Sequence, residues 1–393
     1  MATAIQIIVA VMALCGLGYG LLALWSARDF SREGSRAARP VATFTPDVSI
    51  LKPVKGVDTR MYAGFVSHCN QRYAGRFEIL FGVSTLDDPA VTEVRRLQAE
   101  FLECDIRLIV CPEKLGTSGK VSNLVQMLRQ AKYEHYIVND SDILVSPHYF
   151  ANIFREFAPS ENKTPVGLVT APYIGRTSDD RKQRTVWSKL EALGIATEFF
   201  PGVLTARKIE GGLHFGLGST LAFTRNSLAA IGGLEPLVDY LADDYELGAR
   251  IAAAGQRVVL SREVVETTVP RYSFRQFWEH QMRWACTMND ARKSGYAGVV
   301  FMYGLAWAIF TVIASAGALW SFTLLSMVLL VRVAVALSVG VGLLRDGQVL
   351  RDLWLLPVRD CLSLFLWAWS YADNVVVWRG ERFRLKDGKL QPL

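Results

Sequence analysis

The stretch HYIVNDSD, residues 135–142, decides the fold of this 393-residue chain. Aromatic and β-branched residues are followed at once by two aspartates, which is typical of a buried strand that ends in a polar loop. Residues two apart in an extended segment point the same way, so we expect Asp140 and Asp142 to converge on one ligand. Such a pair suits a divalent cation, Mg²⁺ or Mn²⁺, that also binds a diphosphate. The competing interpretation is a structural turn rich in Asp and Ser.

Apolar, β-rich runs alternate with helical patterns around this stretch. The predicted strands are VSIL (48–51), FEILFGVS (77–84), IRLIVC (106–111), HYIVND (135–140) and VGLVT (166–170), and the predicted helices lie near residues 59–69, 90–103, 120–131 and 147–158. This alternation predicts an α/β domain with a mainly parallel sheet that is buried on both faces. Ligands of such sheets bind beyond the carboxyl ends of the strands, so functional residues should follow strands.

Long apolar segments lie at both ends of the chain, of which 51% is hydrophobic. Residues 4–25 are nearly uncharged and long enough to cross a bilayer, and the arginines that follow favour an anchor over a cleaved signal peptide. Residues 299–318 and 322–343 read as two further spans. Positive charge after the first span, from Arg28 onward, predicts an outside N-terminus and a globular part that faces the cytoplasm.

A further segment, 353–378, is apolar and aromatic but carries charged residues, and a basic stretch follows it. We expect it to be re-entrant or interfacial, because the basic stretch favours the cytoplasm. Arg332 lies inside the second C-terminal span, where it either snorkels or pairs within the protein. The predicted organisation is a transmembrane anchor (1–27), a catalytic domain (28–272), an amphipathic interfacial helix (273–297), membrane segments (298–378) and a basic cytoplasmic tail (379–393).

Charge and cysteine content narrow the class of partner. The net charge is +6, and most of the excess flanks the apolar segments, which suits a lipid bilayer with anionic headgroups. No basic and aromatic motif points to nucleic acid. The six cysteines show no metal-ligand spacing, so we expect reduced thiols that face a cytosol.

The stretch LADDYELGARIAAAG, residues 241–255, predicts a helix with Asp243 and Asp244 at its start. Aspartates at this place often serve only to cap the helix and to complement its dipole. In the functional interpretation Asp244 is a general base that takes the proton of an acceptor hydroxyl. Asp243 beside it would then contact the acceptor or the sugar.

The stretch FRQFWEHQMRWACTM, residues 274–288, predicts a helix with His280 and Arg283 on a polar stripe and Phe277 on the opposite face. An interfacial helix with an aromatic belt has the same pattern. The functional interpretation adds that Arg283 and His280 neutralise a departing diphosphate. Trp284 would supply a stacking face for a sugar or the acceptor.

Other candidates have an ordinary structural interpretation as well. The candidates for nucleotide binding follow the first two predicted strands: Lys52, Pro53, Asp87 and Asp88. Lys120 stands at a predicted helix start, from which it would reach a phosphate. Gly218, in the glycine-rich stretch 211–220, would let the backbone approach the sugar or the acceptor.

Together these motifs resemble those of the ceramide glucosyltransferase type, glycosyltransferase family 21, which is related to the inverting family 2. The resemblance covers nearly the whole chain, and its motifs occur in the same order: FEILFGVSTLDDPA (77–90), KVSNL (120–124), NDSD (139–142), LADDYELG (241–248), the RW of HQMRW (283–284) and VVWRGERFRL (376–385). It implies a Rossmann-like GT-A fold, a UDP-sugar donor, a divalent metal, inversion at the anomeric carbon and a lipid alcohol as acceptor.

Carried over by position, the resemblance makes Asp140 the ligand of metal and diphosphate, with Asp142 beside it. It makes Asp244 the catalytic base, and Arg283 with Trp284 the end of the family's Q/R-x-x-R-W motif.

Three positions depart from the family's pattern. The last motif begins with His280 instead of Gln or Arg, and Gln281 is one residue out of place. Thr85 occupies the position of an expected aspartate after FGVS. Thr197 occupies the position of a histidine that is typical of the ceramide enzymes. The sequence looks closer to the bacterial hopanoid-biosynthesis glycosyltransferases, which are similar to enzymes that add N-acetylglucosamine to a polyol-bearing hopanoid. This resemblance implies a bacterial inner membrane, a donor of N-acetylglucosamine or glucose, and a hopanoid polyol or ceramide as acceptor.

The expected reaction is a single displacement in which Asp244 deprotonates a lipid hydroxyl and Arg283 stabilises the leaving UDP. A processive polysaccharide synthase has similar motifs, but its channel usually needs more membrane spans. A polyprenyl-phosphate sugar transferase would form a phosphodiester. A non-catalytic membrane scaffold or transporter would bind no UDP.

Overall fold

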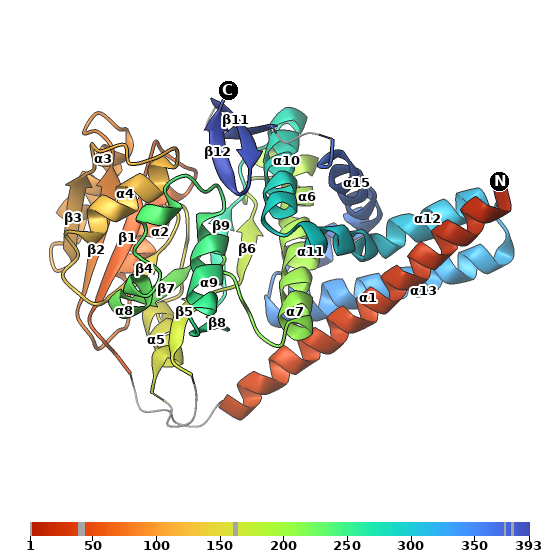
Figure 1. Ribbon diagram of the computed structural model, residues 1–393, viewed down its shortest axis with the longest axis horizontal. Helices are drawn as coiled ribbons and strands as arrows, with labels where there is room; N and C mark the ends of the chain where they lie inside the picture. The colour runs from red at the N-terminus through yellow and green to blue at the C-terminus, as the bar shows by residue number, and fades with distance from the viewer. Residues whose placement is uncertain (1, 38–43, 160–163, 373–374, 379–380) are drawn as a thin grey trace.

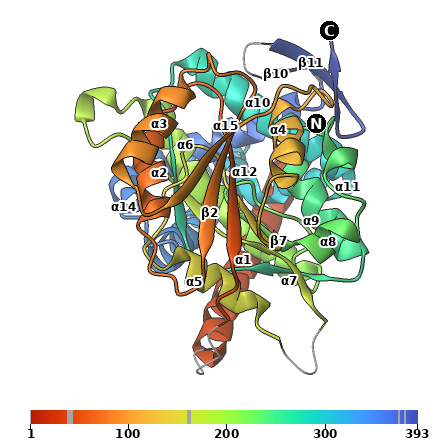
Figure 2. The ribbon, with the colours of Figure 1, turned by 90° about the vertical axis from the view of Figure 1, so that its left-hand side faces the viewer.

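The centre of the protein is a seven-stranded, mainly parallel sheet, as the alternating pattern predicts (Figures 1 and 2). The computed structural model describes residues 2–37, 44–159, 164–372, 375–378 and 381–393. The strand order is β3 (Asp105–Val110), β2 (Phe77–Val83), β1 (Val48–Pro53), β4 (His135–Val138), β7 (Leu221–Thr224), β5 (Val166–Thr170) and β8 (Arg257–Leu260). Only β7 runs antiparallel to its neighbours, β4 and β5.

Helices cover both faces of this sheet. Consecutive side chains of a strand point to opposite faces, and both faces are apolar here, so each face must be buried. On β1, Ile50 packs into one apolar cluster and Leu51 into the other. The first cluster includes side chains of α2 (Met61–Cys69), α3 (Ala90–Glu100) and α5 (Tyr149–Phe154), and the second includes side chains of α4 (Gly119–Leu128) and α9 (Asp243–Ala253). The predicted strands and helices of this region are therefore confirmed, with ends shifted by a few residues.

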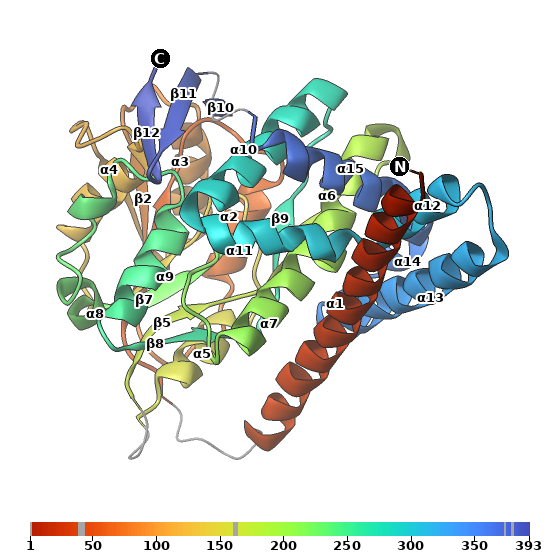
Figure 3. The ribbon, with the colours of Figure 1, turned by 45° about the vertical axis from the view of Figure 1, so that its right-hand side comes forward.

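A long helical element stands between the sheet and the membrane helices (Figures 1 and 3). It consists of α6 (Val186–Gly194), the π-helical segment Ile195–Phe199 and α7 (Phe200–Ile209). The helix predicted near 274–288 is α10 (Phe274–Ala291), which is followed by α11 (Lys293–Gly298); the short α8 is Arg225–Ala229. We call the continuous stretch 186–209 the central rod.

Three helices in the described part of the chain are long and apolar enough to cross a membrane: Thr3–Glu33, Gly295–Ala314 and Leu319–Leu343. They contain α1 (Ala2–Ala37), α12 (Gly304–Ala314) and α13 (Leu319–Val335), which pack together at one side of the molecule (Figure 3). One N-terminal and two C-terminal spans are thereby confirmed. The Gln6 side chain donates a hydrogen bond to the Ala314 carbonyl, so the start of α1 lies beside the turn that joins α12 to α13.

The segment 353–378 is not among these candidate spans. It holds α15 (Leu356–Trp369), whose 14 residues are too few for a crossing, and it ends in the strand β10 (Val375–Trp378). Before it lies α14 (Gln348–Asp352). A third C-terminal crossing is thus absent from the described residues, and an interfacial or re-entrant placement stays a prediction.

Two small sheets complete the fold. A parallel pair consists of β6 (Tyr173–Arg176) and β9 (Val265–Thr268). An antiparallel sheet joins β10 to β11 (Glu381–Lys386) and β12 (Lys389–Pro392), and it packs against α10. Sequence patterns had suggested only a basic tail at this end, so this sheet is a new finding.

Two glycines allow α1 and α12 to touch through their backbones. A Cβ atom added to Gly16 would lie 2.2 Å from the Cα atom of Gly304, whereas one added to Gly18 would meet nothing within 4 Å. We expect Gly16→Ala to weaken the membrane bundle by ~1–3 kcal/mol, because overpacking forces the helices apart. Thermal unfolding in detergent measures this, with Gly18→Ala as the matched control. Equal midpoints for the two variants would contradict the close helix contact.

Candidate active site

Lys120 lies at the centre of the candidate site, between carboxylates from two other parts of the chain. Its ammonium nitrogen is 3.2 Å from Asp140 Oδ1 and 3.2 Å from Asp243 Oδ2. The side chains of Lys120 and Asp243 are 15% and 13% exposed, whereas that of Asp140 is 48% exposed. The loop after β4, the first turn of α4 and the first turn of α9 therefore meet at one ammonium group, and Asp140 forms the open side. We call Lys120, Asp140, Asp243 and Asp244 the acidic centre.

Backbone contacts hold the start of α4 against the segment that leads into α9. Ser118 caps α4 by accepting from the Val121 amide, and the Ser118 amide donates to the Val238 carbonyl at 2.7 Å. The Thr117 amide donates to Asp239 Oδ1 at 2.9 Å. These contacts fix Lys120 beside Asp243, although the two residues are far apart in the sequence.

The turn after β4 corrects one prediction. The strand ends at Val138, and the Ile143 amide donates to the Asp140 carbonyl, so residues 139–142 form a turn rather than an extended segment. Asp140 consequently points to Lys120, while Asp142 Oδ2 accepts hydrogen bonds from the Thr267 hydroxyl at 2.6 Å and the Thr268 amide at 2.8 Å. The two carboxylates do not point the same way, as the spacing of two had suggested.

The glycine-rich stretch 211–220 lies directly on the acidic centre. Asn139 donates from Nδ2 to the Ser219 carbonyl at 2.7 Å, which ties this stretch to the end of β4. A Cβ atom on Gly218 would lie 3.0 Å from Asp244 Oδ2 and 3.8 Å from Asp140 Oδ2. The absence of a side chain at Gly218 therefore leaves space between the two carboxylates, and its place beside the sugar or the acceptor stays a prediction.

The electrostatics of the acidic centre follow from three carboxylates that face one ammonium group. Burial, and then the charge of Asp243, raises the pKa of Asp244 to about 6 against the opposing effect of Lys120. Burial also raises the pKa of Asp243. The pKa of Lys120 is raised, because Asp140 and Asp243 outweigh the effect of its burial. Asp244 is thus a carboxylate whose proton affinity suits a general base near neutral pH.

The residues predicted to bind a nucleotide lie after β1 and β2. Asp88 Oδ1 accepts from the Gly56 amide at 2.8 Å and the Ala90 amide at 2.9 Å, so Asp88 ties two loops and starts α3, while Asp87 is exposed. Pro53 ends β1 and is buried. Lys52 is fully buried and donates to the Asp140 carbonyl at 3.2 Å, and burial lowers its pKa to about 7. Lys52 therefore supports the turn from below.

Aromatic side chains separate the acidic centre from α10. The pKa of the buried Tyr173 hydroxyl is raised by burial first and then by the charges of Asp244, Glu191 and Asp140. The pKa of Tyr272 is raised by burial and by carboxylates that include Asp142, while Arg283 opposes the shift.

Trp284 belongs to the same aromatic layer. Its ring centroid is 5.9 Å from that of Phe199 on the central rod, and Phe199 in turn lies 5.4 Å from Tyr173. Trp284 is thus connected to Tyr173 through Phe199, and Tyr173 is the tyrosine on which the charges of Asp244 and Asp140 act.

His280 lies elsewhere than predicted. Its Nδ1 atom is 3.1 Å from Oε1 of the buried Glu191, on the same side of α10 as Phe277, which packs on Trp187. The expected division into a polar stripe with His280 and an opposite face with Phe277 is therefore wrong. Residues three and four apart share one face of a helix, so the spacing of Phe277, His280 and Gln281 already places them together against α6.

The donor set of the acidic centre fits a divalent cation that a substrate helps to bind. Among the described residues, no group of three or more His, Cys, Asp or Glu side chains is placed to hold a metal ion alone. Mg²⁺ needs only one or two carboxylates when phosphate oxygens and water complete its shell. Asp140, half-exposed after the end of β4, meets this requirement as one carboxylate, whereas Asp142 is held by Thr267 and Thr268.

Sequence reasoning missed several residues that build the site. Asn139 and Glu191 are fully or almost fully buried and use their side chains to join separate elements. Asn139 stands inside the NDSD motif, so its position after a buried strand was a usable signal. Glu191 and Tyr173 have no local motif, since their partners come from distant parts of the chain.

A family model described as "Glycosyl transferase family 21" matches residues 8–391. Among curated proteins the chain is similar to "Ceramide glucosyltransferase 3" of Caenorhabditis elegans, with 25% identity over 240 residues, 61% of this chain and 50% of the relative. It is also similar to "Ceramide glucosyltransferase" of Pyricularia oryzae, with 27% identity over 151 residues, 34% of this chain and 30% of the relative. The chain spans about half or less of the length of these relatives.

Among solved structures, the chain is similar to the mannosyltransferase PcManGT from Pyrobaculum calidifontis, solved in complex with GDP-Man and Mn²⁺. The TM-score is 0.55 at 19% sequence identity, and the match covers 95% of this chain and 98% of that one. At this identity the likeness concerns the fold, and it confirms the predicted glycosyltransferase architecture.

Removal of the central ammonium group should destabilise the protein in a pH-dependent way. At pH 8 Asp243 and Asp244 are ionised, and Lys120→Met leaves them to repel each other in a mostly buried place, at a cost of ~3 kcal/mol. At pH 5, below the pKa of about 6 of Asp244, protonation relieves part of this repulsion. The loss in unfolding midpoint should therefore be larger at pH 8 than at pH 5.

Arg129→Met is the matched control, since Arg129 follows the same helix and pairs with Glu113 at the surface. It should shift the midpoint little and equally at both pH values. A loss for Lys120→Met that does not change with pH would contradict the assigned charges.

Proposed function

The chain belongs to glycosyl transferase family 21, and from this we propose that it transfers a sugar from a UDP-sugar to a hydroxyl group of a membrane lipid. The observation that carries the proposal is the acidic centre, in which Asp244, with its raised pKa, lies beside Gly218 and near the half-exposed Asp140. A base, an open space and a carboxylate for a metal–diphosphate are the parts that glycosyl transfer needs. Three candidate membrane spans in the same chain support a lipid as the acceptor.

In the proposed reaction Asp244 takes the proton of the acceptor hydroxyl, and the oxygen attacks the anomeric carbon of the donor. The bond between that carbon and the β-phosphate oxygen breaks, so UDP leaves with its electron pair and the configuration at the anomeric carbon inverts. Asp140 and Asp142 would hold a Mg²⁺ or Mn²⁺ ion, which neutralises the diphosphate. Arg283 and Lys120 add positive charge on the side of the leaving group.

The other candidates have supporting roles. Pro53, Asp87 and Asp88 line the carboxyl edge of β1 and β2, where a nucleotide binds in sheets of this kind. Trp284 supplies an aromatic face toward the sugar or the acceptor. For His280 we propose a role beside Glu191 rather than on the diphosphate, because its Nδ1 atom lies 3.1 Å from Glu191 Oε1.

The names of the curated relatives favour ceramide, and the sequence resemblance described above favours a hopanoid polyol; N-acetylglucosamine and glucose are the corresponding sugars. We propose that the globular part faces the cytoplasm of a bacterial inner membrane, since positive residues follow the first span. The acceptor would then enter from the inner leaflet.

The direct test is to incubate the purified protein with a panel of UDP-sugars and with either ceramide or a hopanoid polyol, and to identify products by mass. A lipid that gains one hexose or one N-acetylhexosamine supports the proposal. A long polymer would indicate a processive synthase, and a phosphodiester would indicate a polyprenyl-phosphate transferase. No product, together with no binding of UDP, would rule out the proposed activity.

The rate should depend on pH through Asp244. A base works only when it is deprotonated, so kcat/KM should rise about tenfold per pH unit below pH 6 and level off above it, as its pKa of about 6 requires. Asp244→Asn should lower kcat by ~10²–10⁴-fold without loss of UDP binding. The exposed Asp179, changed to Asn, serves as a control with unaltered kinetics. Near-normal turnover of Asp244→Asn would exclude it as the base.

Chelation should abolish transfer, and added Mg²⁺ or Mn²⁺ should restore it, because the two carboxylates at 140 and 142 are the proposed ligands. Asp140→Asn should raise the cation concentration needed for half-maximal activity. Activity that persists in excess EDTA would contradict the metal assignment.

A further inference from the structure

A buried carboxylate on the central rod holds the helix that carries Arg283 and Trp284. Glu191 Oε2 accepts a hydrogen bond from Gln281 Nε2 at 2.6 Å, and its Oε1 lies 3.1 Å from His280 Nδ1. Glu191 is 2% exposed and Gln281 is 6% exposed, so water does not replace these contacts. Both partners precede Arg283 by no more than one helical turn, and a change in their contacts must therefore turn or shift Arg283 as well.

The central rod contacts α10 once in every helical turn. Trp187, Glu191 and Ile195 are four residues apart and form one stripe of the rod. The first contacts Phe277 with ring centroids 5.6 Å apart, the second binds His280 and Gln281, and the third packs with Trp284. Glu191 is the polar member in the middle of this stripe. The apolar contacts have no preferred direction, whereas the hydrogen bond from Gln281 to Glu191, with the His280 ring beside it, favours one register of α10.

Arg283 on α10 and the turn that carries the proposed metal ligands both influence Tyr272. The charge of Arg283 acts on Tyr272, on which the charges of Asp142 and Asp58 also act, and Asp58 accepts a hydrogen bond from the Ser141 hydroxyl. Tyr272 is therefore the residue that feels both the charge of Arg283 on α10 and the charge of the residue 139–142 turn.

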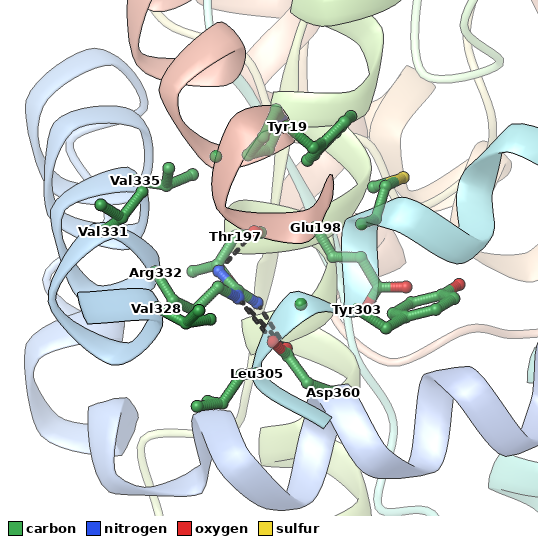
Figure 4. A pocket seen from close by; sticks show the side chains of 15 residues that line it. Tyr19, Thr197, Glu198, Tyr303, Leu305, Val328, Val331, Arg332, Val335 and Asp360 are labelled. Carbon is green, nitrogen blue, oxygen red and sulfur yellow. Dashed lines mark hydrogen bonds and ion pairs between the residues drawn. The ribbon is translucent and has the colours of Figure 1, made fainter. Parts of the chain in front are cut away.

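The far side of the rod is fixed to the membrane segments by similar buried charges. Arg359 Nε donates to Glu198 Oε2 at 2.8 Å, and its guanidinium lies where a side chain on Gly194 would be. Arg332 on α13 binds both carboxylate oxygens of Asp360 and donates to the Thr197 carbonyl at 2.9 Å (Figure 4). The membrane segments consequently hold one side of the central rod, and α10 packs against its other side.

We propose that Glu191 is a positioning residue for glycosyl transfer: through His280 and Gln281 it sets the register of α10, so that Arg283 meets the diphosphate of the nucleotide sugar. The inference rests on the proposed function, since it needs a diphosphate at the acidic centre. It assigns no chemical step to Glu191 itself. It also gives the displaced glutamine of the motif, Gln281, a role as a support of Arg283.

The test is calorimetric binding of UDP in the presence of Mn²⁺ to the full-length protein and its variants, which requires no acceptor. Arg283→Ala should raise the Kd of UDP ~10-fold, because a charge-assisted hydrogen bond is lost. Glu191→Ala should raise it by a similar factor, and the double variant by no more than the larger single effect. Glu191→Gln keeps an acceptor for Gln281 and should bind UDP more tightly than Glu191→Ala.

Glu279→Ala is the matched control, because Glu279 lies on α10 and pairs with Arg275 of the same helix. It should bind UDP as the unaltered protein does. A purely structural role for Glu191 would lower the unfolding midpoint and yet leave the Kd of the folded variant unchanged, and this result would overturn the inference. Additive effects in the double variant would overturn it too. If the unaltered protein binds no UDP, the proposed function fails instead.

Discussion

The candidate site depends on one ammonium group. Lys120 lies between Asp140 and Asp243, and Asp244 stands next to them, so three carboxylates share a mostly buried place with one cation. Without that cation their repulsion and loss of hydration would push α4, α9 and the turn after β4 apart. The same lysine leaves one carboxylate, Asp140, exposed toward the space in front of the strand ends. A single interaction thereby holds the loops together and leaves one carboxylate of the site accessible.

A second constraint comes from buried charges among the apolar membrane segments, since such charges need partners. Arg332 is buried on α13, and its partners are the Asp360 carboxylate and a carbonyl of the π-helical segment. Isolated charges at such positions are costly, so the partners select one arrangement of helices. A π-helical turn alters the backbone hydrogen bonding of the rod at Ile195–Phe199, where Thr197 offers its carbonyl outward. The π-helical segment thus provides a carbonyl acceptor for the buried guanidinium of Arg332.

The sequence predicts most of the fold because its strands are short, apolar and separated by regular helical patterns. It fails where tertiary partners override a local rule. Residues 139–142 turn instead of extending, since Thr267 and Thr268 bind Asp142 on one side and Lys120 binds Asp140 on the other. His280 was assigned to the exposed side of α10 although it follows the buried Phe277 by three residues, a spacing that puts both on one face; its partner Glu191, on another helix, has no local signal. The terminal strands escaped notice because a basic, partly apolar end reads equally well as a tail.

The anchor is attached to the rod as well as to the other membrane helices. Lys208 and Arg207, at the end of α7, pair with Asp29 and Glu33 on α1, at 2.7 Å and 2.5 Å. These residues follow the apolar part of α1, where a helix leaves the bilayer. Because the rod is fixed to α1 at this end and to α10 at the other, packing contacts join a candidate membrane span to the helix that carries Arg283 and Trp284. The position of α10 relative to α1 is therefore set by side-chain contacts.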